Sequence, residues 1–399
     1  MKIGVISADF AHENRVALTP DAVKKLRKLG FEVVIQSGAG CAAYYADDLY
    51  QAAGASIVGG SSDVIAAARI ITTVNDLPST ITESLASGQI VIGMLDPYRN
   101  TQLDIYAAKG VSAFAMELLP RTLSRAQNMD VLSSQANLAG YKAVLLAANE
   151  YSRPFPMFMT SAGTVKPAKV VILGVGVAGL QAIATAKRLG AVVEASDLRP
   201  AAKEQVESLG GKWLDVPMSE EEAQKAKATG GYAWTPSEQY IKDQAAVVDK
   251  ALSAADIVIT TAQIPGRQAP RLVHQATIAK MRAGSVLIDM AAATGGNVEG
   301  SVENETITTV NGVRIVGAGN IPSMLAAQSS DFYANNLVNF ITTLIASEGT
   351  SEAILEATTD NNNSDTKVGS KLTLHLNMED EIQGALAVTH DGQVRLTKR

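Results

Sequence analysis

The stretch Val170-Val-Ile-Leu-Gly-Val-Gly-Val-Ala-Gly179 decides the fold of this 399-residue chain. Its first four residues are apolar and predict a buried strand, and a Gly-x-Gly-x-x-Gly pattern leads into the Ala- and Leu-rich segment 180–189, which predicts a helix. In such a unit Gly174 permits a tight turn, Gly176 lets a pyrophosphate approach the backbone, and Gly179 allows close packing. The free amides that begin the helix would then face the phosphates of a dinucleotide.

A carboxylate follows the next predicted strand. Segment 191–196 is mostly apolar and is followed by Asp197, at the spacing where an acidic residue binds the hydroxyls of an adenosine ribose. The carboxylate would repel a 2′-phosphate, so we expect NAD(H) rather than NADP(H), although nearby Arg199 could accept such a phosphate. The alternative is a structural glycine turn with a surface aspartate. The strand, turn, helix, strand and acid are all in register, which favours the dinucleotide site.

Short apolar runs alternate with helical patterns along most of the chain. One predicted helix has Thr19 as its N-cap and Pro20 at its first position, and it ends at Gly30. Such alternation predicts parallel sheets with helices on both faces. The predicted strands are 2–6, 31–35, 70–74, 90–94, 112–115, 170–174, 192–196, 257–261, 286–290 and 313–316.

Two long predicted helices divide the chain into two lobes. The first runs from Asp130 to about Tyr151, where Ser152-Arg153-Pro154 ends it, and the second runs from near Ser330 to Ala346. We therefore expect an α/β fold of two Rossmann-like, parallel-sheet lobes with a nucleotide cleft between them. The expected limits are residues 1–129 plus about 325–399 for the first lobe, and 130–324 for the NAD(H)-binding lobe.

The C-terminal part of the first lobe has a different composition. Residues 356–370 contain almost no apolar side chain and predict a flexible loop. We expect short strands after it at 372–376, 384–389 and 393–396, the last two joined across a His-Asp-Gly turn.

Composition excludes several classes of protein. Lys and Arg number 34 against 40 Asp and Glu, and the net charge of −6, without a basic cluster, argues against nucleic acid as a partner. The single cysteine, Cys41, cannot form an internal disulfide, and we expect a small buried residue in a reducing compartment. The four histidines lack metal-ligand spacing, so no metal is expected. The apolar stretch 170–186 is shorter than a membrane span, and the N-terminal apolar run is too short for a secretory signal.

A dense polar segment, 120–130, precedes the first long helix, where the two lobes should meet. It contains Arg121, Gln127 and Asp130, and Ser133 follows in the first helical turn. Composition alone favours Asp130 as a helix N-cap with solvated arginines, while positioning groups at a binding site are the alternative.

A further candidate is Thr229-Gly-Gly-Tyr-Ala233, on a long connection before the next predicted helix. A tyrosine after paired glycines suits a mobile lid over a bound nucleotide. A loop tip with an exposed tyrosine is an equally good interpretation of these residues.

Several longer motifs carry a resemblance to a known family. The longest is Arg-Ala-Gln-Asn-Met-Asp-Val-Leu-Ser-Ser-Gln-Ala-Asn-Leu-Ala-Gly-Tyr-Lys-Ala-Val at 125–144. Others are 174–190, 203–211, 230–233, 260–266 and 295–297. Together they resemble the NAD(H)-binding alpha subunit of proton-translocating NAD(P) transhydrogenases, whereas Glu13-Asn-Arg-Val-Ala-Leu-Thr-Pro20 is shared with the related alanine dehydrogenases. The resemblance covers nearly the whole chain and is strong from about 115 to 339.

The resemblance implies direct hydride transfer from NADH, bound here, to NADP+ on a separate beta subunit, coupled to proton translocation. It implies that Arg121, Gln127, Asp130 and Ser133 surround the nicotinamide end, with Gln127 reaching toward NADP(H), and that Tyr232 closes over NAD(H). Such transfer needs close positioning of two rings and no general acid or metal. The expected nucleotide-binding residues are Gly174, Gly176, Val177, Ala178, Gly179, Asp197, Leu198, Arg199, Gly231, Tyr232, Thr261 and Ala262.

The resemblance also implies partners and a location. The chain would be the first portion of a split alpha subunit, dimeric, and bound to a beta subunit and a small membrane alpha subunit. It would lie in the cytoplasm, on the inner face of the membrane. Two alternatives stay open: a soluble amino-acid dehydrogenase of the alanine dehydrogenase type, and an NAD-sensing protein without catalysis.

The sequence departs from the family pattern in three places. The stretch from Pro120 is one residue longer, which makes Arg121 rather than Arg125 the expected counterpart. Ser7-Ala8-Asp9 replaces the usual Pro-Lys/Arg-Glu. Thr73 and Met94 stand where alanine dehydrogenases carry a substrate lysine and a catalytic histidine, although Arg15 could still clamp a carboxylate.

Overall fold

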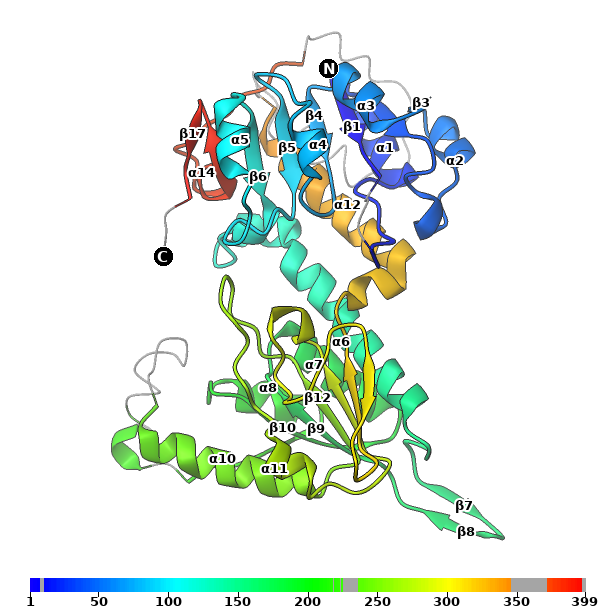
Figure 1. Cartoon of the computed structure of the whole chain (residues 1–399), viewed down its shortest axis with the longest axis vertical. Coiled ribbons are helices and arrows are strands. Elements are labelled where there is room, and N and C mark those ends of the chain that lie inside the picture. The colour runs from blue at the N-terminus through cyan, green and yellow to red at the C-terminus, as the bar shows by residue number, and fades with distance from the viewer. Residues whose placement is uncertain (8–10, 218, 223, 225–235, 346–371, 397–399) are drawn as a thin grey trace. The chain divides into compact units, whose positions relative to one another are not determined.

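The computed structural model describes residues 1–7, 11–217, 219–222, 224, 236–345 and 372–396. The chain forms two compact units, each with its own sheet (Figure 1). The first unit comprises Met1–Gln135 and Ser323–Arg399, and the second comprises Ala136–Pro322.

The first unit is built on an eight-stranded sheet in the order β17-β16-β6-β5-β4-β1-β2-β3. The strands from β3 to β6 are parallel, and β16 joins β6 antiparallel, so the C-terminal segment of the chain extends a sheet begun at the N-terminus. The central strands are buried on both faces, as their unbroken apolar sequences require. The strands are β1 (Lys2–Val5), β2 (Glu32–Gln36), β3 (Ser56–Val58), β4 (Ile70–Thr72), β5 (Ile90–Gly93), β6 (Ser112–Ala115), β16 (Ala387–His390) and β17 (Gln393–Val394).

Helices cover both faces of this sheet and bury two apolar clusters against it. Pro20 begins α1 with its fixed φ, and Gly30 follows its end at a φ of +91°. The ring of Phe340 packs on that of Phe114 at 5.3 Å, which joins α12 to β6. The elements are α1 (Pro20–Lys28), η1 (Cys41–Ala43), α2 (Asp47–Ala52), α3 (Ser61–Ala67), α4 (Ser79–Thr82), α5 (Leu103–Ala108), η2 (Met116–Leu118), η3 (Ser124–Met129), α12 (Ala326–Thr343) and α14 (Glu381–Leu386).

The second unit has a seven-stranded sheet in the order β11-β10-β9-β12-β13-β15-β14. All neighbours are parallel except the edge strand β14. The strand order reverses at β9, which pairs with β10 on one side and β12 on the other, and ligands of such sheets bind at this reversal. The strands are β9 (Lys169–Leu173), β10 (Val192–Ser196), β11 (Lys212–Trp213), β12 (Ile257–Thr260), β13 (Val286–Asp289), β14 (Thr306–Thr308) and β15 (Arg314–Gly317).

The helices of the second unit pack closely because their contacts use small residues. A Cβ atom on Gly140 would lie 2.1 Å from the carbonyl oxygen of Ala178, so α6 and α7 meet at backbone contact. A separate hairpin, β7 (Phe158–Thr160) with β8 (Gly163–Val165), follows α6. The other elements are α6 (Val131–Glu150), α7 (Val177–Arg188), α8 (Ala202–Ser208), α10 (Glu238–Ser253), α11 (Gln275–Ile278), η4 (Ala292–Thr294) and η5 (Ile321–Leu325).

The predicted fold class, two Rossmann-like lobes with parallel sheets, is confirmed. The predicted strand at 384–389 is partly wrong, because the Asp380 carboxylate accepts the amides of Ile382 and Gln383 and so caps a helix, α14, in its place. Residues 372–376 form no strand, only a single bridge between Leu374 and Ile345.

Other expectations also need correction. Cys41 is exposed, because it begins the surface turn η1 rather than packing in the core. The second long helix begins at Ala326, earlier than expected. The predicted loop at 356–370 lies outside the described residues.

Glu117 is a buried carboxyl group of the first unit, on η2 just after β6. Its Oε1 atom accepts the amide of Asp96 at 2.6 Å. None of the described residues donates a hydrogen bond to its inaccessible Oε2 atom. Burial therefore raises the pKa of Glu117 to about 7.

We expect this carboxyl group to make the stability of the fold depend on pH. Its pKa is higher in the folded chain than in the unfolded chain, so the free energy of unfolding should fall as pH rises from about 4.5 through about 7. The advantage of Glu117→Gln over the parent chain should grow by up to about 3 kcal/mol between pH 4.5 and pH 8. Urea denaturation at several pH values measures this difference, and a difference independent of pH would contradict the raised pKa.

Candidate functional site

The glycine motif forms the turn between β9 and α7, as its pattern predicts. Gly174 has a φ of +93°, which L side chains rarely adopt, and a Cβ atom on Gly179 would lie 2.0 Å from the carbonyl oxygen of Gly174. A Cβ atom on Gly176 would meet nothing within 4 Å, so the space above this residue is open. Gly176 is also the N-cap of α7 and supplies no side-chain cap. The first-turn amides, those of Val177 and Ala178 among them, can therefore bind an anion.

Asp197 is bonded to this turn. Its Oδ2 atom accepts the amide of Val175 at 2.6 Å, and its Oδ1 atom accepts the amide of Arg199 at 2.8 Å and the Nε atom of the same residue at 3.0 Å. Burial alone would raise the pKa of Asp197, but the hydrogen bonds from Arg199 and Val175 outweigh it and hold the pKa below its usual range. The carboxylate is thus charged at neutral pH. The Leu198 side chain between them is 55% exposed.

The end of β12 lies against the other side of the same turn. The Thr261 hydroxyl donates to the carbonyl oxygen of Gly174 at 2.9 Å, and the Thr261 amide donates to Leu173 at 2.9 Å. Three neighbouring strand ends therefore bring Asp197, the glycine turn and Thr261-Ala262 together. Every nucleotide-binding residue expected among the described residues lies at this edge of the sheet.

The polar segment of the first unit forms a compact cluster. Arg121 donates from Nε to Asp130 Oδ2 at 2.8 Å and from Nη2 to the Ser133 hydroxyl at 2.6 Å. The Ser133 amide donates to Asp130 Oδ1 at 2.9 Å, so the same carboxylate also caps the helix. Burial would raise the pKa of Asp130, but the bonds from Ser133 and Arg121 lower it below its usual range.

Gln127 stands apart from this cluster. Its side chain is exposed on η3, and in the described structure no hydrogen bond joins it to Arg121, Asp130 or Ser133. The second arginine, Arg125, pairs elsewhere, with Asp380 at 2.9 Å and Glu381 at 3.6 Å. The remaining candidates, Gly231 and Tyr232, lie outside the described residues.

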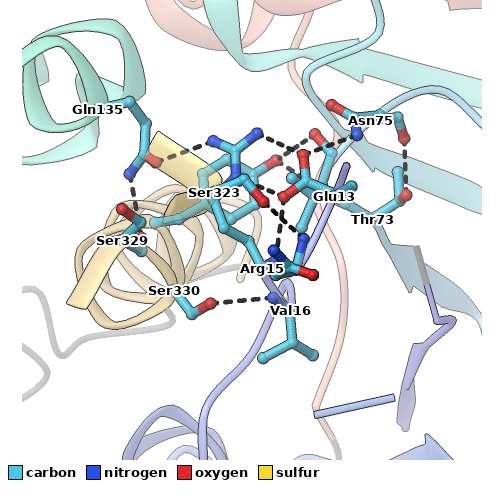
Figure 2. Close-up of polar contacts among 12 residues, drawn as sticks. Glu13, Arg15, Val16, Thr73, Asn75, Gln135, Ser323, Ser329 and Ser330 are labelled. Carbon is cyan, nitrogen blue, oxygen red and sulfur yellow. Dashed lines mark hydrogen bonds and ion pairs between the residues drawn. The ribbon is translucent and has the colours of Figure 1, made fainter. Parts of the chain in front are cut away.

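Sequence reasoning missed a buried polar network around Arg15, shown in Figure 2. The Arg15 guanidinium donates from Nε and Nη2 to the two carboxylate oxygens of Glu13, at 2.8 and 2.6 Å, and from Nη1 to Gln135 Oε1 at 2.9 Å. The side chains of Arg15 and Glu13 are at most 4% exposed, and Asn75 donates to Glu13 at 3.0 Å. The Glu13-x-Arg15 pattern was the available signal, because a buried arginine needs a charged partner.

Serine hydroxyls connect this network to α12. The Asn14 amide donates to Ser323 at 2.7 Å and the Val16 amide donates to Ser330 at 2.9 Å (Figure 2). Nearby, the Thr73 hydroxyl donates to the carbonyl oxygen of Asn75 at 2.6 Å.

The described residues hold no group of three or more His, Cys, Asp or Glu side chains that could bind a metal ion. Among the helices that the structure describes, none has the length and apolar content to cross a membrane.

Comparison with known proteins places the chain among two related groups. The first portion of the split alpha subunit of the Rhodospirillum rubrum NAD(P) transhydrogenase is 45% identical over 402 residues, which cover 99% of this chain and 97% of that protein. The alanine dehydrogenase of Methanococcus maripaludis is 27% identical over 370 residues, 89% of this chain and 90% of that one.

The solved structures agree with this result. The crystal structure of transhydrogenase from Sinorhizobium meliloti matches with a TM-score of 0.83 and 44% identity, covering 99% of this chain and 100% of that chain. Residues 4–139 match the family model of the alanine dehydrogenase/PNT N-terminal domain, and residues 143–374 match that of its C-terminal domain. The resemblance inferred from the motifs is confirmed, and this chain belongs to the alanine dehydrogenase/PNT family.

Proposed function

We propose that this chain is the NAD(H)-binding component of an NAD(P) transhydrogenase. In this proposal a hydride passes from NADH on this chain to NADP+ on a beta subunit, and membrane subunits couple the transfer to proton translocation. The observation that carries the proposal is the meeting of Asp197, the glycine turn and Thr261 at the reversal of the strand order. The name of the Rhodospirillum rubrum relative, which is 45% identical, supports the reaction.

The residues at this edge fit a dinucleotide. The open space above Gly176 and the uncapped first turn of α7 suit a pyrophosphate, since backbone amides and the helix dipole favour negative charge there. Asp197 is a charged acceptor placed for ribose hydroxyls. When bound, the nicotinamide supplies the hydride, and this chain needs only to hold and orient it.

The Arg121 cluster suits such a positioning role. Asp130 and Ser133 fix the guanidinium of Arg121, whose side chain is 47% exposed, so a positive charge and a hydroxyl are held in one arrangement at the surface. The exposed side chain of Gln127 supports the proposal that it reaches toward a group on another subunit. Positioning of this kind can supply a large share of a rate enhancement.

The alanine dehydrogenase alternative finds less support in the site. The three guanidinium nitrogens of Arg15 already donate to Glu13 and Gln135, so a substrate carboxylate would have to displace Glu13. Neither Thr73 nor Met94 can donate a proton to a keto acid as a histidine does.

Our proposal includes a homodimer and attachment to the membrane through partner subunits. The β7–β8 hairpin supports the dimer: Met157, Phe158 and Met159 are 59%, 50% and 73% exposed on and beside it. An isolated two-stranded hairpin is marginally stable in water, and a second copy of this chain would bury these apolar side chains. The designation of the Rhodospirillum rubrum relative as a portion of an alpha subunit supports the further subunits.

We expect Asp197 to determine the preference for NADH over NADPH. Asp197→Ala should weaken NADH binding by about tenfold, because ribose hydrogen bonds are lost, and should narrow the gap to NADPH. Fluorescence titration of both nucleotides measures the two affinities. The control is Asp21→Ala, which makes the same charge change at an exposed ion pair in the first unit. Equal affinities of the parent chain for both nucleotides would sink the assignment.

We expect the purified chain neither to oxidise alanine nor to aminate pyruvate. Thr73 and Met94 provide no acid or base at the required positions, and Glu13 engages Arg15. A spectrophotometric assay of NADH formation from alanine is sufficient. Appreciable turnover there would restore the dehydrogenase alternative.

We expect Gln127 to act on transfer rather than on binding. Gln127→Asn should leave NADH affinity within a few-fold and slow transhydrogenation by ~10²-fold, the loss expected when positioning fails. The assay mixes this chain with an NADP(H)-binding beta subunit and follows hydride exchange to a nicotinamide analogue. The control is Gln51→Asn, the same change at an exposed position of α2.

Two results of this assay would count against us. Equal losses of affinity and rate in Gln127→Asn would contradict the bridging role. Tight NADH binding with no exchange in the parent mixture would favour an NAD-sensing protein.

A further inference from the structure

Asn297 is a fully buried amide that holds the backbone of Ala262. Its Oδ1 atom accepts the Ala262 amide at 3.1 Å, and its Nδ2 atom donates to the Ala262 carbonyl at 2.9 Å. Nδ2 also donates to the carbonyl of Pro270 at 2.8 Å. The side chain therefore fixes both polar groups of one residue at the end of β12.

Asp289 holds the loop that carries Asn297. This carboxylate at the end of β13 is fully buried and accepts three amides, those of Ala291, Asn297 and Val298, at 3.0 to 3.1 Å. Gly296 allows the loop to pass so near, with a φ of +78°; a Cβ atom there would lie 2.7 Å from Asp289 Oδ2. The Gly-Gly-Asn sequence at 295–297 is thus required by the carboxylate it surrounds.

The sheet order indicates which half of a dinucleotide this loop would meet. Asp197 follows β10, on one side of β9, and Thr261-Ala262 follows β12, on the other side. A pyrophosphate on the turn at Gly174 would lie between them. If Asp197 binds the adenosine ribose, the opposite half of the dinucleotide extends over Ala262, whose amide lies 3.2 Å from the place of a Cβ atom on Gly174.

We propose that Asn297, supported by Asp289, is a positioning residue for the nicotinamide half of NAD(H), acting through the backbone of Thr261-Ala262. This inference rests on the proposed function, and it assigns a role to two motifs, 260–266 and 295–297, that the hydride transfer itself leaves unexplained. Neither side chain needs to touch the nucleotide. Their contribution is to hold one wall of the site in a single conformation.

The test compares NADH with 5′-AMP, which carries only the adenosine half. In Asn297→Ala we expect the affinity for NADH to fall roughly tenfold or more, the change that corresponds to about one net hydrogen bond, while the affinity for 5′-AMP stays within about twofold. Isothermal titration calorimetry measures both. Asp197→Ala should instead weaken both ligands. Equal losses for NADH and 5′-AMP in Asn297→Ala, or no loss for either, would overturn the proposal.

Asn311→Ala is the matched control. The Asn311 amide also bridges two carbonyl oxygens, those of Ile278 and Met281 at 3.0 and 3.2 Å, but it precedes β15 and so lies at the opposite edge of the sheet. This variant should bind both ligands like the parent, and a selective loss of NADH affinity in it would contradict us.

A second variant separates misfolding from a change in the site. If thermal unfolding shows that Asn297→Ala does not fold, Asn297→Ser decides the same question with a smaller loss of polarity. Failure of the parent chain to bind NADH would overturn the proposed function. Normal binding by the parent with an unchanged NADH to 5′-AMP ratio in the folded variant would overturn this inference alone.

Discussion

The close approach of Gly179 to the carbonyl oxygen of Gly174 is the constraint on which the second unit depends. Only glycine fits there, since a Cβ atom would lie 2.0 Å from that oxygen. Helix α7 therefore starts directly above the end of β9, and the backbone of the turn comes within hydrogen-bond reach of both neighbouring strands. Asp197 accepts the Val175 amide from one side, and Thr261 donates to Gly174 from the other. Three strand ends become one site for this reason.

Buried carboxylates organise the loops at the strand ends, and their surroundings decide what each can do. Asp289 accepts three amides and so orders a glycine loop, while Glu13 is neutralised by Arg15 and ties that arginine into the first unit. Both arrangements offset the cost of removing a charge from water. Glu117 has no such cation beside it: its Oε1 atom accepts the Asp96 amide at 2.6 Å, and burial raises its pKa to about 7. It consequently titrates near neutral pH.

Much of the fold could be predicted because its signals are local. The strand before Gly174, the glycine spacing and Asp197 follow one another in sequence, so the reversal of strand order was the only tertiary fact they needed. The 384–389 segment could not be assigned from its apolar residues, because the deciding contact is the cap by Asp380. The exposure of Cys41 likewise depends on the packing around η1 rather than on residue type.

The candidate site shows why composition alone could not choose between structural and functional interpretations. Asp130 accepts the Ser133 amide as a helix cap and pairs with Arg121 at the same time, so both interpretations describe one carboxylate. Arg15 shows the converse: its sequence motif is shared with alanine dehydrogenases, yet Glu13 and Gln135 take up its donors. Two proteins of one fold can thus keep an arginine while only one leaves it available to a substrate. The chemistry follows from the partners of each side chain, and not from the fold that presents it.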